Sequence, residues 1–158
     1  MLDAVTYPQD EVANTLNTRF IPVQVNTQED AGKSIVERYR QVWTPDIRVL
    51  GPDGFDYASW TGYLPPAEYL AQLLLAQAYA YLRMHDEPRA AEVFSEVARR
   101  FPTSYAAPEA EYYQAVAHYK ASHEPADLRG PQGWERVRSR YQESIWRIKQ
   151  IWSEEPGA

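Results

Sequence analysis

The sequence predicts an α+β fold, because the spacing of its apolar residues changes once along the chain. Before Pro66 the apolar residues form short runs, among them Ile47–Leu50 and Phe55–Thr61, which a glycine-containing turn joins into a hairpin. After Pro66 they recur about every 3.6 positions, as in amphipathic helices. We therefore expect a sheet-containing unit in residues 1–70 and a helical unit in residues 66–158, with one helix shared between them.

The first unit contains three further expected elements. They are a helix over Asp10–Phe20, a strand over Ile21–Val25 and a helix over Gln28–Arg40. Pro22 lacks a backbone N–H, so we expect the strand to lie at a sheet edge. In the hairpin turn, Pro52 fixes one backbone angle and Gly54 can adopt the positive φ that closes the turn.

The second unit contains four predicted amphipathic helices. Their apolar positions are Leu70, Leu73, Leu74, Ala78, Tyr81 and Leu82 in the first, Ala90, Ala91, Phe94, Val97, Ala98 and Phe101 in the second, Ala110, Tyr113, Ala117 and Ala121 in the third, and Trp134, Val137, Tyr141, Ile145, Ile148 and Trp152 in the last. Residues Ser122–Gly133 hold two prolines and two glycines and predict a loop. For the last helix we expect either continuity or a break near Ser144.

Residues 71–104 have the spacing of a paired-helix repeat. Small and large apolar residues alternate between the two helices, and a proline closes the second; these residues are Leu74, Ala78, Tyr81, Ala90, Phe94 and Pro102. This segment resembles a tetratricopeptide repeat, a helix pair of about 34 residues. A second, weaker match follows with Tyr112, Ala115 and Tyr119. Because a free-standing array usually needs about three repeats, we expect these helices to pack against the sheet unit.

The whole chain resembles bacterial thioredoxin-like proteins that carry a short helical repeat extension. The matching segments are Thr6–Pro8 with Glu11 and Val12, Phe20–Val25, Trp43–Pro45, Pro52–Gly54 and Gly62–Leu70. The resemblance implies a cis peptide bond before Pro45 and a peptide-binding role for the backbone of Thr44. Trp43 is interpreted as a core or loop-packing aromatic rather than as a substrate platform. The first strand, first helix, central strand and cysteine pair of these proteins have no counterpart here.

The missing central strand leads to an expectation about the sheet. In the thioredoxin-like arrangement that strand separates the counterparts of Ile21–Val25 and Ile47–Leu50. If the gap closes within one chain, these segments pair directly in a three-stranded antiparallel sheet, with Val23 and Val49 on the side buried by Leu70 and Leu73. If it does not close, a strand from another molecule fills it.

Composition and charge exclude several function classes. The chain of 158 residues has a formal charge of −6, which argues against nucleic acid as a partner. It contains no cysteine, so thiolate catalysis, disulfides and thiolate metal sites are excluded. His85, His118 and His123 lack metal-ligand spacing, and no cofactor is expected. The carboxylates Glu109, Glu111, Glu154 and Glu155 are interpreted as solvated surface groups. No membrane span is expected, because the longest apolar-rich stretch, Leu70–Leu82, is too short.

Three functional hypotheses remain open from the sequence. The favoured one is a non-catalytic, cytoplasmic adaptor that binds a protein or peptide through the Trp43–Pro45 loop, the helical groove or the open sheet edge. The second is a thiol–disulfide oxidoreductase whose Cys-x-x-Cys pair lies upstream of Met1. The third is a homodimer in which two incomplete sheets complete each other through the open edge.

Overall fold

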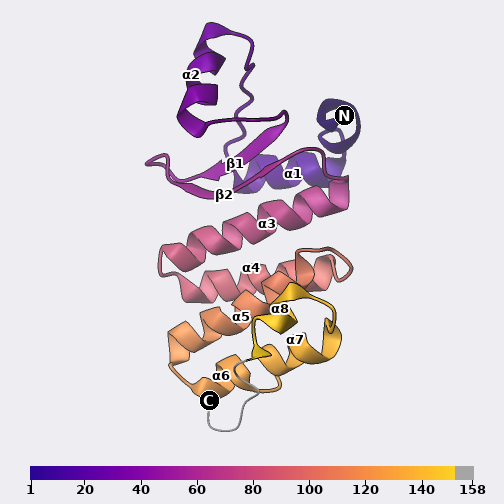
Figure 1. The fold of residues 1–158 in the computed structure, drawn as a ribbon, viewed down its shortest axis with the longest axis vertical. Coiled ribbons are helices and arrows are strands. Elements are labelled where there is room, and N and C mark those ends of the chain that lie inside the picture. Colours follow the sequence, from indigo (N-terminus) through magenta and orange to yellow (C-terminus); the bar gives the residue numbers. More distant parts are fainter. Residues whose placement is uncertain (152–158) are drawn as a thin grey trace. The chain divides into compact units, whose positions relative to one another are not determined.

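The computed structural model describes residues 1–151 and divides the chain into two compact units. The boundary falls between Leu70 and Ala71, inside helix α3 (Pro66–Arg83), close to where the sequence period changes. The described elements form a mixed α+β fold that is mostly helical and contains a two-stranded antiparallel sheet (Figure 1). The expected α+β class is therefore confirmed. None of the described helices is both long and apolar enough to cross a membrane.

The first unit consists of short helices and one hairpin. Its elements before α3 are the π-helix η1 (Leu2–Thr6), α1 (Asp10–Arg19), α2 (Asp30–Tyr39), β1 (Asp46–Leu50) and β2 (Asp56–Thr61). The two predicted helices and both hairpin strands are confirmed to within two residues at each end. Its buried apolar side chains are few, namely Leu2, Val12, Tyr69 and Leu70.

The hairpin is built as its turn sequence predicts. Asp46 pairs with Thr61 and Ile47 with Trp60, and the register shifts after Val49. Gly54 has φ of +80°, a conformation that glycine adopts at little cost, and its N–H donates to the Gly51 carbonyl at 2.9 Å. On one face of the sheet, the Trp60 ring packs edge-on against Tyr69 at the start of α3, with ring centroids 5.9 Å apart.

The expected third strand is wrong. Residues Ile21–Val25 form no strand, and among the described residues no backbone hydrogen bond joins them to β1. Ile21 and Val23 are 92% and 78% exposed, so Val23 does not share a buried face with Val49. The physical reason is that alternating apolar and polar residues show which side of a strand would be buried, but not which strand it would pair with. An extended segment becomes a β-strand only when a neighbouring strand forms backbone hydrogen bonds with it.

The second unit is helical. After α3 its elements are α4 (Glu87–Arg100), α5 (Ala107–Ser122), α6 (Pro125–Arg129), α7 (Trp134–Arg140) and α8 (Ile145–Ile148). The first three predicted helices are confirmed. The expected loop Ser122–Gly133 is wrong in part, because it contains α6, which Pro125 begins. The last predicted helix breaks before Ser144, whose hydroxyl accepts from the Trp146 N–H and caps α8. Trp152 lies outside the described residues.

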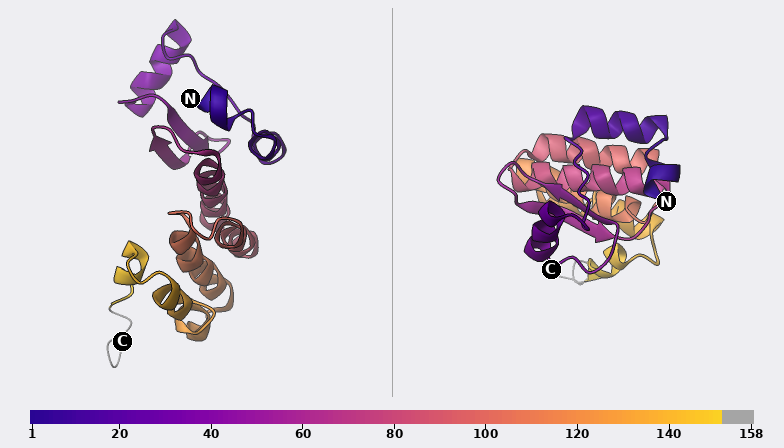
Figure 2. Two further views of the ribbon diagram at one scale, coloured as in Figure 1. Left: turned by 90° about the vertical axis from the view of Figure 1, so that its right-hand side faces the viewer. Right: turned by 90° about the horizontal axis from the view of Figure 1, so that it is seen from above.

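The core of the second unit joins α3, α4 and α5, which lie side by side (Figures 1 and 2). Small residues at the centre, including Ala78 and Ala90, are fully buried and allow the helices to approach closely. Phe94 fills the space between them and contacts Tyr79 at 5.5 Å between ring centroids. The ring contacts continue through Tyr112, Tyr113, Trp134 and Trp146, and so tie α7 and α8 to the same core.

Candidate functional site

The loop between α2 and β1 places the sequence-predicted residues Trp43, Thr44 and Pro45 at the surface of the first unit. The Thr44–Pro45 peptide bond is cis, as the resemblance implied. The Gln41 side-chain amide donates to the Trp43 carbonyl at 3.1 Å, and the Pro45 carbonyl accepts from the Gly62 N–H at 2.8 Å. The loop backbone is thereby tied to the sheet next to it.

Trp43 is 69% exposed and the neighbouring Val42 is 85% exposed. The interpretation of Trp43 as a core or loop-packing aromatic is therefore wrong. The reason is local: both faces of the hairpin near this loop are already supplied with side chains, by Trp60 with Tyr69 on one face and by Arg48 with Tyr39 on the other. Val42 and Trp43 therefore expose two large apolar side chains to solvent in the loop before β1.

A charged cluster on β1 holds this part of the unit together. The Arg48 guanidinium contacts Asp46 at 2.8 Å and Asp56 at 2.6 Å, and donates to the Tyr39 carbonyl at 3.3 Å. The hydrogen bond that Arg48 donates to the Asp46 carboxylate raises the pKa of Arg48 above its ordinary value, although burial opposes the shift. The Arg48 guanidinium lies 4.7 Å from the centroid of the Tyr39 ring. The cluster fixes the end of α2 against the strand, and so fixes the direction in which the Trp43 loop leaves α2.

The two units differ in how many of their large apolar side chains are buried and how many are exposed. Among the described residues, the first unit buries four large apolar residues and exposes nine, whereas the second unit buries eight and exposes five. The nine are Met1, Val5, Ile21, Val23, Val25, Val42, Trp43, Leu50 and Phe55. We call these nine residues the exposed apolar set. Single exposed apolar residues are ordinary, so what distinguishes the first unit is their number beside so few buried ones.

The repeat residues other than Pro102 lie in the core of the second unit or pack against it. Leu74, Ala78, Ala90 and Phe94 belong to one buried cluster, against which Tyr81 packs. Pro102 is exposed just after α4. These residues position helices, and none of the buried ones is available to a ligand.

Sequence reasoning missed a buried ionic network in the same unit. Glu111 on α5 is 1% exposed, and its carboxylate accepts from Arg136 at 3.1 Å, from Arg140, and from the Tyr141 hydroxyl at 3.1 Å. The reading of Glu111 as a solvated group is therefore wrong. The charge is buried because three donors from α7 and the residue after it surround it. No local pattern around Glu111 signals these partners, which follow 25 to 30 residues later.

Glu109 is likewise not a solvated surface group. Its carboxylate accepts a hydrogen bond from the Tyr79 hydroxyl on α3. Burial raises the pKa of Glu109, while the Tyr79 hydrogen bond and the charge of Lys149 oppose that rise. Burial also raises the pKa of Tyr79, and the Glu109 carboxylate adds to the effect. The pair joins α3 to α5 and is a structural contact.

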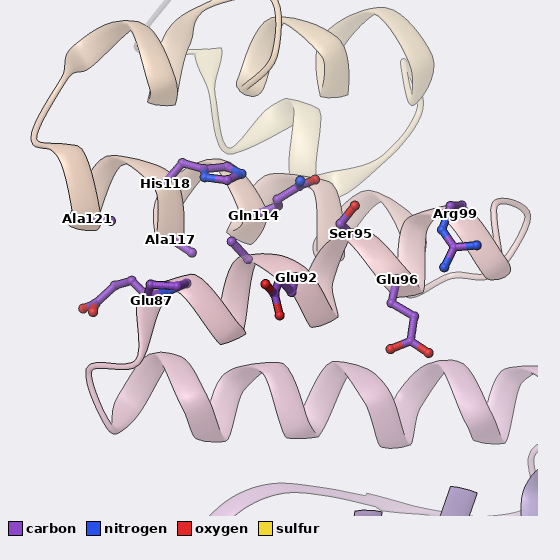
Figure 3. Close-up of a pocket in the computed structure, with 11 residues that line it drawn as sticks. Glu87, Glu92, Ser95, Glu96, Arg99, Gln114, Ala117, His118 and Ala121 are labelled. Carbon is purple, nitrogen blue, oxygen red and sulfur yellow. The ribbon is translucent and has the colours of Figure 1, made fainter.

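A shallow groove of about 560 Å³ lies between α4 and α5 (Figure 3). Its lining consists of small residues with charged and polar groups above them, namely Glu87, Pro88, Ala91, Glu92, Ser95, Glu96, Arg99, Gln114, Ala117, His118 and Ala121. Glu96 is bonded to Arg100, and Glu87 lies 4.0 Å from Lys120. These carboxylates are thus already partnered, and the groove offers hydrogen-bonding groups rather than an arranged nucleophile and base. Among residues 1–151 there is no cluster of three or more side chains suited to a metal ion.

No family model, curated protein or solved structure matches this chain. Among the described residues, the exposed apolar set of the first unit is the main feature from which a function can be inferred.

Proposed function

We propose that this protein is a protein-interaction module and that residues 1–70 carry its principal binding surface. The observation that supports the proposal is the contrast in the first unit between four buried and nine exposed large apolar residues. Apolar surface is removed from water with a gain of about 25 cal/mol per Å². A partner that covers the exposed apolar set would therefore gain free energy that the isolated unit does not obtain.

Trp43 and Val42 are the residues that we assign to the centre of this surface. An exposed tryptophan supplies a large contact area with little conformational freedom to lose, which is why tryptophan is enriched among the residues that dominate binding. The Arg48 cluster and the Gln41 hydrogen bond hold the loop, so the aromatic side chain is presented from a fixed backbone. The second unit, with its dense core, serves as the stable scaffold of the module.

The test compares two pairs of serine variants of the full chain. Val42→Ser with Trp43→Ser removes the proposed contact, and Met84→Ser with Tyr105→Ser removes two exposed apolar side chains from the second unit. Each protein is immobilised at equal density and exposed to an extract of the source cells, and captured proteins are quantified by mass spectrometry. We expect the first pair to lose roughly tenfold or more of a defined captured protein, since a buried interface aromatic contributes at least about 1–2 kcal/mol.

The control pair should capture the same protein as the wild type. Equal capture by all three proteins, or loss in the control pair alone, contradicts the assignment. Circular dichroism of each variant checks the fold, which should be unchanged because all four side chains are exposed.

A further inference from the structure

The outer edge of β2 is open, and its backbone geometry follows from one hydrogen bond. The Gly62 N–H donates to the Pro45 carbonyl at 2.8 Å, which identifies this position of the ladder as a hydrogen-bonded one. Hydrogen-bonded and non-hydrogen-bonded pairs alternate along antiparallel strands. The pairs Asp46 with Thr61 and Arg48 with Ser59 are therefore non-hydrogen-bonded. Ser59 and Thr61 direct their backbone N–H and C=O groups away from β1.

No other described segment uses these groups. Apart from the ladder with β1, no backbone hydrogen bond reaches Ser59 or Thr61, and both residues are exposed. Charge and proline, two features that usually prevent pairing between molecules, are absent from the C-terminal part of this edge. Tyr57–Thr61 contains no charged residue and no proline, and the uncharged run continues to Ala67; the register shift makes Tyr57, at the start of this segment, the extra residue of a bulge.

We propose that this edge pairs with the same edge of a second copy of the chain, antiparallel and about a two-fold axis at Ser59. The inference deepens the proposed function, because it names one partner of the first unit. An axis through Ser59 sets the regular residues Ala58–Trp60 of the two β2 strands opposite one another and brings the outward-facing backbone groups of the two Ser59 residues together. The small Ala58 then lies beside the large Trp60 ring of the second copy, and the bulged Tyr57 falls near Thr61 of that copy.

Charge favours a second copy at this place over other parts of the unit. The first unit has ten acidic and five basic residues, so two copies repel one another over much of their surface. At the β2 edge no carboxylate faces another. Asp56, at the beginning of the strand, falls opposite Gly62 of the second copy and is paired with Arg48 of its own chain at 2.6 Å. The result is a continuous four-stranded sheet in the order β1, β2, β2, β1.

The absence of cysteine from the chain makes a direct test available. In a Ser59→Cys variant the new thiol is the sole one, and the two Cα atoms at the axis are about 5.5 Å apart, within the range of a disulfide. In a Thr61→Cys variant the two Cα atoms are roughly 14 Å apart along the strands and cannot be bridged. Under mild oxidation at micromolar concentration, we expect a disulfide-linked dimer from Ser59→Cys and none from Thr61→Cys or the exposed control Thr103→Cys.

Sedimentation of the cysteine-free protein supplies the second measurement. We expect reversible association to twice the 18.2 kDa chain mass. Ser59→Lys places two like charges at the axis and should weaken association roughly tenfold or more, while Thr103→Lys should not. A wild type that stays monomeric, cross-linking that is equal at positions 59, 61 and 103, or a dimer unaffected by Ser59→Lys overturns the proposal. None of these results changes the capture of a partner protein by Val42 and Trp43. The dimer proposal can therefore fail while the proposed function stands, and the reverse is also true.

Discussion

At the scale of single residues, small side chains set the helix packing of the second unit. Ala90 is fully buried in the cluster that contains Leu74, Ala78 and Phe94. Replacing Ala90 with Leu inserts three carbon atoms into a packed interior, and should lower the free energy of unfolding by about 1–3 kcal/mol. Arg99→Ala, on the exposed side of the same helix, should change it by no more than about 0.5 kcal/mol. Chemical denaturation measures both values, and equal values for the two variants would mean that the helix pair is wrongly assigned.

A second residue-scale prediction concerns Tyr141, whose hydroxyl donates to the buried Glu111 carboxylate. Burial, followed by the negative charge of Glu111, raises the pKa of Tyr141 to about 12. Because the folded pKa lies above the unfolded value of about 10, the stabilisation is complete below pH 10 and is lost as the pH rises to about 12. Tyr141→Phe should make the fall in stability over this range shallower, by on the order of 1 kcal/mol after solvent screening.

The measurement for Tyr141 is denaturant unfolding at pH 9, 10, 11 and 12. Tyr105→Phe is the matched control, because its ring is 89% exposed. Identical pH dependence in wild type and Tyr141→Phe would contradict the assigned hydrogen bond to Glu111.

At the scale of elements, Ile21–Val25 differs from every segment in the helical core. Its backbone makes no hydrogen bond to another described segment, and three of its apolar side chains are exposed. We expect the amides of Ile21, Val23 and Val25 to exchange with solvent within minutes at neutral pH, whereas the amide of Phe94 exchanges only through larger openings. Hydrogen exchange followed by mass spectrometry or NMR measures this difference. Slow exchange throughout 21–25 in the purified protein would show that a partner strand is already present.

Helices α1 to α5 and the hairpin could be predicted because their signals are local: periodic apolar residues, Pro and Gly at turns, and a capping residue such as Asp86, which accepts from the Arg89 N–H. The Ile21–Val25 segment could not, because its alternating pattern carries no information about a partner strand. The small helix α6 was hidden by the prolines and glycines around it.

The candidate site was predictable in part. The resemblance pointed to Trp43, Thr44 and Pro45, and to the cis bond, but not to the exposure of Trp43. The exposure of the Trp43 side chain depends on which other side chains cover the sheet, and this cannot be read from the residues next to Trp43 in the sequence. The same limit explains Glu111: its burial depends on Arg136 and Arg140, which reach α5 only after the chain has passed through α6.

At the scale of the whole molecule, the absence of cysteine bears on the redox alternative. Thiol–disulfide exchange requires a thiolate as the attacking group. The 158 residues contain none, so the purified chain should not accelerate the reduction of insulin by dithiothreitol above a heat-inactivated control. A dithiol oxidoreductase of known activity, assayed in parallel, shows that the assay responds. Turnover by the pure chain would contradict this expectation and would require another reducing group.

The most direct test of the proposed binding surface uses a photoreactive group at one introduced cysteine. Val42→Cys places the label in the exposed apolar set, and Thr103→Cys places the same label on an exposed position of the second unit. Both labelled proteins are irradiated in an extract of the source cells, and cross-linked peptides are identified by mass spectrometry. The account predicts that the label at position 42 joins a defined segment of one partner protein, and that the label at position 103 does not. The same cross-links at both positions, or none at position 42, would contradict it.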